Sequence, residues 1–131
     1  MTDLQILESY RATCLEMDAI RQQMQRMEIS GKPHGMSSQD TSDIGRSTND
    51  KTAAAIQTLD GLEAALEERM QILQKIVARF EQIVASVQVP MGRVVLRRYY
   101  GMGETDAQVA AAMGYSERRV NQIRNAAIRY L

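Results

Sequence analysis

The last helix-forming stretch of the chain, MGYSERRVNQIRNAAIRYL at residues 113–131, gathers side chains that can recognise nucleic acid. At about 100° per residue, a helix here has apolar residues on one face and arginine and amide side chains on the other. In the major groove of DNA, arginine pairs with guanine, and asparagine or glutamine pairs with adenine. The side chains that we predict to contact bases are Arg118, Asn121, Gln122 and Asn125.

A second group of side chains on and before this helix is suited to DNA phosphates. Phosphate contacts orient a protein on the duplex without reading its sequence, and arginine and serine commonly make them. A serine at the start of a helix adds the helix N-terminus to such a contact. The predicted phosphate-contacting residues are Ser116, Arg119, Arg124 and Arg129, with Arg97 and Arg98 from the preceding segment.

The residues before the last helix have the pattern of a helix-turn-helix. Thr105 and Gln108 form a capping box that predicts a helix start, and Gly114 is a typical left-handed helix terminator. Ser116 can cap the last helix after a turn of about three residues, which is the spacing of a helix-turn-helix. Three inward positions suit two crossing helices, one small and two apolar: Ala110, Val120 and Ile123.

Two longer segments must carry this unit. The first is predicted to be helical from about residue 3 to residues 28–30, and the second from about residue 50 to residue 87, ahead of Pro90. Both have apolar residues at alternating spacings of four and three, which is typical of helices that pack along their length. These positions are Ile6, Tyr10, Thr13, Met17, Ile20, Met24 and Met27, then Ala55, Leu59, Leu62, Leu66, Arg69, Leu73, Ile76, Phe80, Ile83 and Val87.

The predicted fold is therefore all-α, with two parts. Residues 1–89 form a long antiparallel, coiled-coil-like helical hairpin, with a flexible Ser- and Gly-rich loop at 30–50. Residues 90–131 form the helix-turn-helix domain. Because the second helix has more apolar residues than a two-stranded seam needs, we expect a homo-oligomer, a dimer or higher, through the long helices.

Composition excludes several other classes. Residues 1–90 have nine Lys and Arg against 13 Asp and Glu, whereas residues 91–131 have seven Arg against three acids, so only the C-terminal part suits a polyanion. No stretch is apolar enough to span a membrane, and the N-terminal residues lack a signal-peptide pattern. The lone His34 and Cys14 have no catalytic companions, so we expect no enzyme, no metal and no cofactor.

The segment at residues 92–131 resembles the promoter-binding C-terminal region of bacterial sigma factors. The wider layout resembles the ArpU/RinA group of phage transcriptional regulators: a heptad helix, a Ser-rich loop leading into NDK, a second long helix, and a sigma-like end with RRYYG and MGYSERRV. Glu117 and Asn121 depart from the sigma pattern, where basic residues are frequent. The positions shared with sigma factors are Thr105, Val109, Ala110, Gly114, Ser116, Arg119, Val120, Gln122, Ile123, Ala127 and Leu131.

This resemblance implies a sequence-specific regulator of phage or prophage late genes, such as packaging or lysis genes, in the cytoplasm of a bacterial host. The expected partner is double-stranded DNA. Two alternatives stay open. Small terminase subunits for viral packaging also join a helix-turn-helix to long oligomerising helices, and a sigma-like end could instead bind a protein such as host RNA polymerase.

Overall fold

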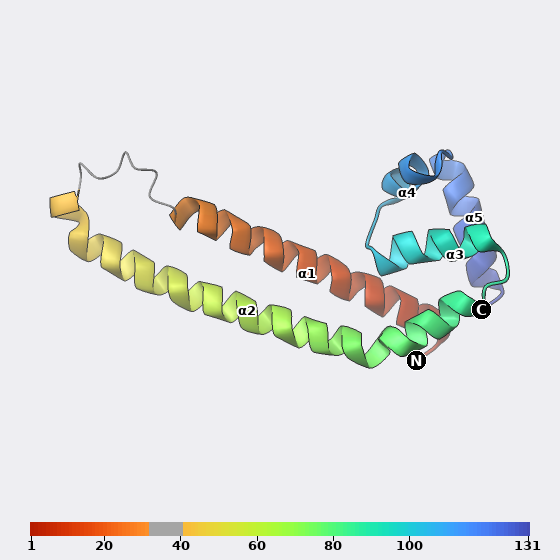
Figure 1. Cartoon of the computed structure of the whole chain (residues 1–131), viewed down its shortest axis with the longest axis horizontal. Helices are drawn as coiled ribbons and strands as arrows, with labels where there is room; N and C mark the ends of the chain where they lie inside the picture. Colours follow the sequence, from red (N-terminus) through yellow and green to blue (C-terminus); the bar gives the residue numbers. More distant parts are fainter. Residues whose placement is uncertain (32–40) are drawn as a thin grey trace. The chain divides into compact units, whose positions relative to one another are not determined.

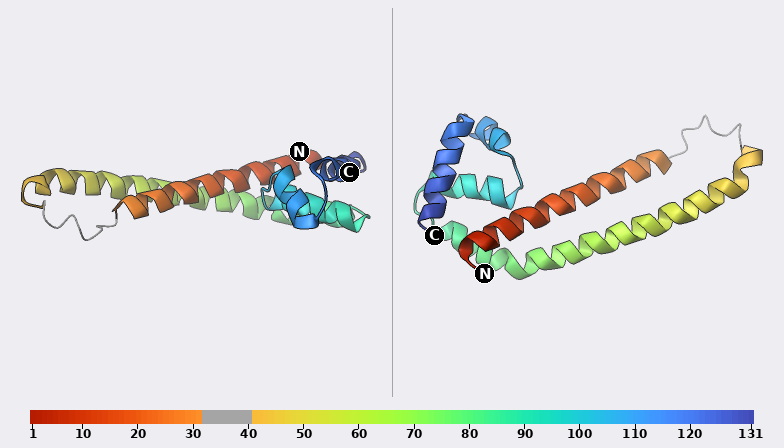
Figure 2. Two further views of the ribbon diagram at one scale, coloured as in Figure 1. Left: turned by 90° about the horizontal axis from the view of Figure 1, so that it is seen from above. Right: turned by 180° about the vertical axis from the view of Figure 1, so that it is seen from behind.

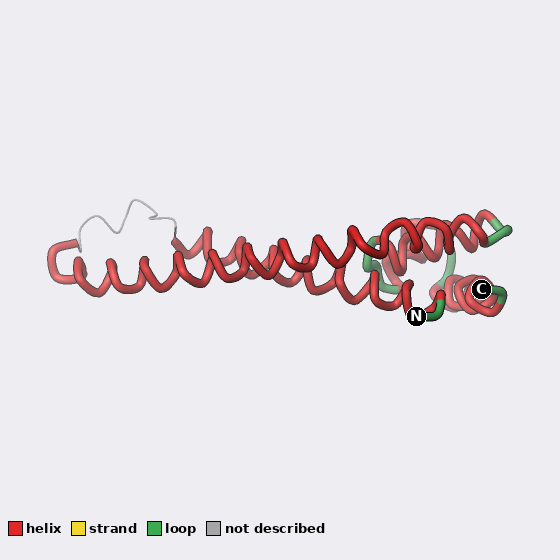
Figure 3. The backbone as a smooth tube through the Cα atoms, turned by 90° about the horizontal axis from the view of Figure 1, so that it is seen from below, coloured by secondary structure: helices red, strands yellow, loops and turns green. Residues whose placement is uncertain are grey.

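In the computed structural model the described residues form a series of helices (Figures 1 and 3). The structure describes the backbone of residues 1–31 and 41–131 and the side chains of residues 1–27 and 53–131. No strand occurs in these residues, which confirms the predicted all-α class, and none of their helices is long and apolar enough to cross a membrane. The elements are α1 (Asp3–Gly31), α2 (Thr41–Ser86), α3 (Pro90–Leu96), the π-helix η2 (Arg97–Gly101), α4 (Asp106–Met113) and α5 (Glu117–Arg129).

Local sequence signals place most helix ends where the structure has them. At the start of α1, Thr2 and Gln5 exchange two hydrogen bonds, each backbone N–H donating to the other's side chain at 2.8 and 3.2 Å. Helix α1 ends at Gly31 and α2 at Ser86, each within about a residue of the prediction. Pro90 occupies the first turn of α3, where its missing N–H has no helical partner to lose.

The start of α2 is where the prediction was wrong. The helix begins at Thr41, about ten residues before the expected start, so residues 41–50 are helical rather than part of a loop. Hydrophobic periodicity reports a buried face and not helicity itself, and a polar segment can extend a helix that its neighbour has nucleated. Residues 32–40 of the predicted loop lie outside the described residues.

The chain divides into two compact units, Met1–Glu16 with Met70–Leu131, and Met17–Arg69. In the second unit the described heptad positions of both helices are buried or half-buried, whereas most residues between them are exposed. Met17 is buried, and the half-buried positions are Ile20, Met24, Met27, Ala55, Leu59, Leu62, Leu66 and Arg69. The heptad pattern therefore identifies the inward face of each helix.

The core of the first unit joins both long helices to the C-terminal helices. The first turns of α1 run antiparallel to the last turns of α2 (Figures 1 and 2). Tyr10 of α1 stacks on Phe80 of α2 with ring centroids 4.1 Å apart. The buried members of this cluster are Ile6, Leu7, Phe80, Ile83, Val84, Val87, Leu96, Tyr100 and Ala127, so the core extends beyond the expected 90–131 region.

A second cluster holds α4 and α5 together on α3. Val109 and Ala110 of α4 pack against Val120 and Ile123 of α5, and Val95 of α3 closes the cluster. Val95, Val109 and Val120 are fully buried. The small side chain of Ala110 fits the close crossing of the two helices that the sequence pattern predicts.

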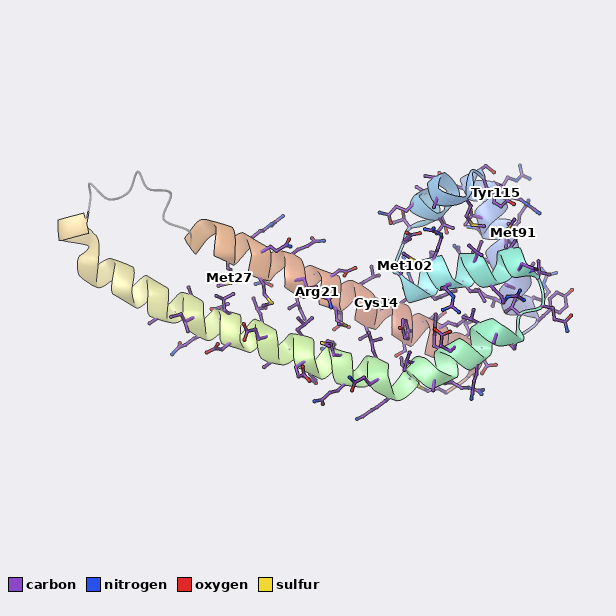
Figure 4. The ribbon with its side chains drawn as sticks, in the orientation of Figure 1. Cys14, Arg21, Met27, Met91, Met102 and Tyr115 are labelled. Carbon is purple, nitrogen blue, oxygen red and sulfur yellow. The ribbon has the colours of Figure 1, made fainter. Side chains whose placement is uncertain are left out.

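Side chains of α1 fasten the segment that leads into α4. The guanidinium of Arg11 donates from Nη1 to the carbonyl oxygens of Tyr99, at 2.5 Å, and Glu104, at 2.8 Å. The Cys14 thiol lies beside the same segment (Figure 4), with Sγ 3.6 Å from the carbonyl oxygen of Gly101. Gly103, at a φ of 71°, passes close to Leu15. These contacts fix the backbone that positions α4 and α5.

Candidate nucleic-acid interface

The start of α5 is built by the turn that the sequence predicts. Gly114 has a φ of 72° and ends α4, and the Ser116 hydroxyl then accepts a hydrogen bond from the backbone N–H of Arg119 at 3.1 Å. Thr105 and Gln108 form the expected capping box at the start of α4. Between the helices, the Tyr115 hydroxyl lies 3.6 Å from Met91 Sδ on α3, as Figure 4 illustrates. Both predicted caps and the left-handed terminator are confirmed.

Replacing Gly114 with alanine tests how much this turn depends on its left-handed backbone. An added Cβ would meet open space, so the expected loss of about 1–2 kcal/mol in the free energy of unfolding comes from the backbone conformation alone. Gly61, inside α2 and also in open space, is the matched control. Gly61→Ala should stabilise the chain, by about 0.5–1 kcal/mol. Urea unfolding of both variants checks the opposite signs, and equal shifts would contradict this account.

Burial divides α5 into the two faces that its sequence predicts. Val120, Ile123 and Ala127 are buried against α3 and α4. Within α5, six of the predicted site residues are exposed: Arg118, Arg119, Asn121, Gln122, Asn125 and Arg129. Among the described side chains, no carboxylate forms an ion pair with Arg118, Arg119 or Arg129. These three guanidinium groups are therefore available to an external anion.

Three of the predicted base-contacting residues line one shallow depression of about 430 Å³ on this face. They are Arg118, Asn121 and Gln122, and the depression is completed by the carboxylates of Asp106 and Glu117. The surface thus combines guanidinium and amide donors with carboxylate acceptors. That mixture can distinguish the donor and acceptor patterns that base pairs present in the major groove.

Arg124 does not belong to this exposed face. Its guanidinium forms an ion pair with Asp106 at the start of α4, and its side chain is only 12% exposed. It also stacks on the Tyr99 ring, 4.0 Å from the centroid. Arg11 lies 3.8 Å from the same centroid, and two guanidinium groups at these distances must occupy opposite faces of the ring. We therefore leave Arg124 out of the candidate interface and assign it to the packing of α4 and α5.

Arg97 and Arg98 also have carboxylate partners inside the first unit. Arg97 donates two hydrogen bonds of 2.9 Å to Glu81 on α2, and these bonds lower the pKa of the Glu81 carboxyl. Arg98 lies 3.2 Å from Glu104. Because carboxylates neutralise both arginines, we leave Arg97 and Arg98 out of the candidate interface.

The candidate interface also contains a chain of hydrogen bonds that the sequence pattern did not predict. Asn121 donates from Nδ2 to Asp106 Oδ2 at 3.4 Å, and Asn125 donates from Nδ2 to Asn121 Oδ1 at 2.9 Å. The four-residue spacing of the two asparagines was a visible signal, since such pairs are neighbours on a helix. Asp106 is 15 residues from Asn121, and only the crossing of α4 and α5 brings them together.

A separate, mostly apolar groove of about 600 Å³ runs between the end of α2, α3 and α5. Its walls include Val87, Val89, Met91 and Tyr130, and Arg119 and Gln122 also line it. No group of three His, Cys, Asp or Glu side chains that could hold a metal ion occurs in the described part of the chain.

The candidate interface is therefore the exposed polar face of α5 with the start of α4. Its central residues are Arg118, Asn121, Gln122 and Asn125, flanked by Arg119 and Arg129. Comparisons of this chain with protein-family models, curated proteins and solved structures gave no match.

Proposed function

We propose that this chain is a sequence-specific regulator of transcription that binds double-stranded DNA through α4 and α5. In this proposal the two helices are a sigma-like helix-turn-helix, and α5 lies in the major groove. The observation that carries the proposal is the division of α5. Its apolar residues are buried, whereas its amides face outward together with three arginines that have no carboxylate partner among the side chains that the structure describes.

The distribution of positive charge supports the same surface as the one that binds DNA. The seven arginines of residues 91–131 are not equivalent, because Arg97, Arg98 and Arg124 are neutralised by carboxylates. The arginines that remain on α5 lie on its exposed face. An anionic duplex would therefore meet its strongest attraction at the helix that also carries the base-reading amides.

From the resemblance to the ArpU/RinA group, we also propose which genes the chain regulates and what its long helices do. The regulated genes would be phage or prophage late genes, and the long helices would form a hairpin that joins copies of the chain. Because a single helix-turn-helix reads few bases, two joined copies would read two half-sites. The heptad positions of α1 and α2 supply the apolar faces for such a hairpin.

Selection of duplexes from random DNA, with the intact chain, tests the proposal. The wild-type chain is expected to give a consensus. Gln122→Ala and Arg118→Ala should each relax it at one position, by about 5- to 150-fold, because a bidentate base contact contributes about 1–3 kcal/mol. Unchanged preferences would show that these two residues do not read bases.

A salt titration separates phosphate contacts from base contacts. Arg119→Ala should weaken binding to all duplexes and reduce the slope of log K against log salt by about 0.9. The matched control is Arg97→Ala, which also removes one arginine, but one on η2 that is paired with Glu81 of α2. The control should leave the slope unchanged.

The same measurements discriminate the alternatives. A chain that shows no salt-sensitive affinity for duplex DNA would favour a protein partner such as host RNA polymerase. Light scattering separates the two DNA-binding functions. A ring of about eight or more subunits would favour a small terminase, whereas a dimer or tetramer would favour a regulator.

A further inference from the structure

The exposed face of α5 carries two amides whose orientations depend on one carboxylate. Asp106, the first residue of α4, accepts from Asn121, and Asn121 accepts from Asn125. Both asparagines are exposed on the proposed DNA-binding face, whereas Asp106 is half-buried beside them. We call Asp106, Asn121 and Asn125 the amide chain.

The polarity of the amide chain is set at its Asp106 end. An ionised carboxylate can only accept hydrogen bonds, so Asn121 must turn its NH₂ group toward Asp106. The carbonyl oxygen of the Asn121 side chain then faces Asn125. Asn125 must in turn donate from Nδ2, which leaves its own Oδ1 and one remaining N–H for a ligand. A single acid thus determines what Asn125 presents.

Asp106 is held rigidly enough to act in this way. Its carboxylate forms an ion pair with Arg124, whose guanidinium stacks on Tyr99. Arg11 of α1 covers the opposite face of the same ring and donates to two backbone carbonyl oxygens. The anchor of the amide chain therefore reaches through Tyr99 to α1.

We infer that Asp106 is a positioning residue that sets base specificity, acting through Asn121 to make Asn125 a reader of adenine. Adenine presents an N6 amino donor beside an N7 acceptor in the major groove, which matches the acceptor and donor left on Asn125. With the opposite polarity, Asn125 would present two N–H donors, which match the O6 and N7 acceptors of guanine. This inference rests on the proposed function, because it requires α5 to lie in the major groove.

Asp106→Asn is the decisive variant, because a neutral amide can donate as well as accept and no longer fixes the amide chain. The measurement is the ratio of affinities for two duplexes that differ only by adenine or guanine at the position assigned to Asn125. For the wild-type chain we expect adenine to be preferred by about 5- to 150-fold. Asp106→Asn should reduce this ratio toward one. The ratio does not depend on the folded fraction, so a loss of stability does not obscure it.

Asn125→Ala identifies the base pair that Asn125 contacts and tests whether Asp106 acts on specificity through Asn125. It should remove the same adenine preference. The variant that combines Asp106→Asn with Asn125→Ala should have the same adenine-to-guanine ratio as Asn125→Ala alone. Asp106→Glu, which keeps an acceptor-only group, should retain the preference.

Glu117→Gln is the matched charge control. It removes one negative charge from the same depression, but no hydrogen bond joins Glu117 to either asparagine in the described structure. It should strengthen binding to both test duplexes and leave the adenine-to-guanine ratio at the position assigned to Asn125 unchanged.

Two outcomes overturn the inference in distinguishable ways. A wild-type consensus whose adenine-to-guanine ratio Asp106→Asn leaves unchanged would show that Asp106 only holds α4 and α5 together, and the proposed function would stand. A wild-type chain that binds duplexes without any base preference would overturn the proposed function and the inference together.

Discussion

Phe80→Ala is expected to lower the free energy of unfolding of the first unit by about 3–5 kcal/mol. The ring is 1% exposed, stacks on Tyr10 and lies beneath Gly101 of η2, where an added Cβ would approach it to 3.1 Å. Its removal leaves a cavity among α1, α2 and η2. Because one core joins these helices to α5, the loss should affect the long helices and the C-terminal helices together.

Two spectroscopic signals can follow this effect separately. The far-ultraviolet circular dichroism is dominated by α1 and α2, whereas four of the five tyrosines lie in residues 90–131 and there is no Trp. Both signals should shift to lower urea together in Phe80→Ala. Val77→Ala, at a more exposed position of α2, is the matched control, with an expected change below about 0.5 kcal/mol. A shift confined to one signal would contradict a shared core.

Residues 90–131 produced alone are expected to be largely unfolded, although they contain the whole proposed helix-turn-helix. Leu96, Tyr100 and Ala127 are buried in a cluster that includes side chains of α1 and α2, and without these helices the isolated segment would expose them to more water. Only the smaller cluster around Val95 and Val120 would remain. A segment of about 40 residues seldom buries enough apolar surface to fold without further support.

Circular dichroism of this segment, compared with that of the full chain, measures the effect. The expected result is a weak helical signal that declines gradually on heating. A cooperative thermal transition in the isolated segment would show that α3, η2, α4 and α5 fold independently of α1 and α2.

Structural features that depend on a few neighbouring residues were predicted well from the sequence. The capping box of Thr105, the left-handed Gly114, the Ser116 cap and the position of Pro90 each depend on backbone geometry within one turn of a helix. The inward faces of α1 and α2 were also visible, because a heptad spacing records burial directly.

Features that depend on distant partners were not predictable in this way. Arg124 and Arg129 look alike in the sequence of α5, yet Arg124 meets Asp106 and Tyr99 while Arg129 is exposed. Arg97 similarly finds Glu81 across the interface between η2 and α2. Helix periodicity gives the direction of a side chain but not the neighbour that it contacts. The arginines that are paired with carboxylates could therefore be removed from the predicted phosphate-contacting residues only once the fold was known.

The hydrogen bonds of Arg11 bear on how the chain acquires its structure during synthesis. The two carbonyl oxygens that this guanidinium binds belong to residues 88 and 93 positions later in the chain. At ribosomal rates of about 5–20 residues per second, the N-terminal segment waits roughly 5–20 s before these acceptors have been made. Contacts of such high sequence separation also slow folding, because a long loop must close before they form. The guanidinium of Arg11 therefore stays in contact with water on the nascent chain until translation has passed Glu104.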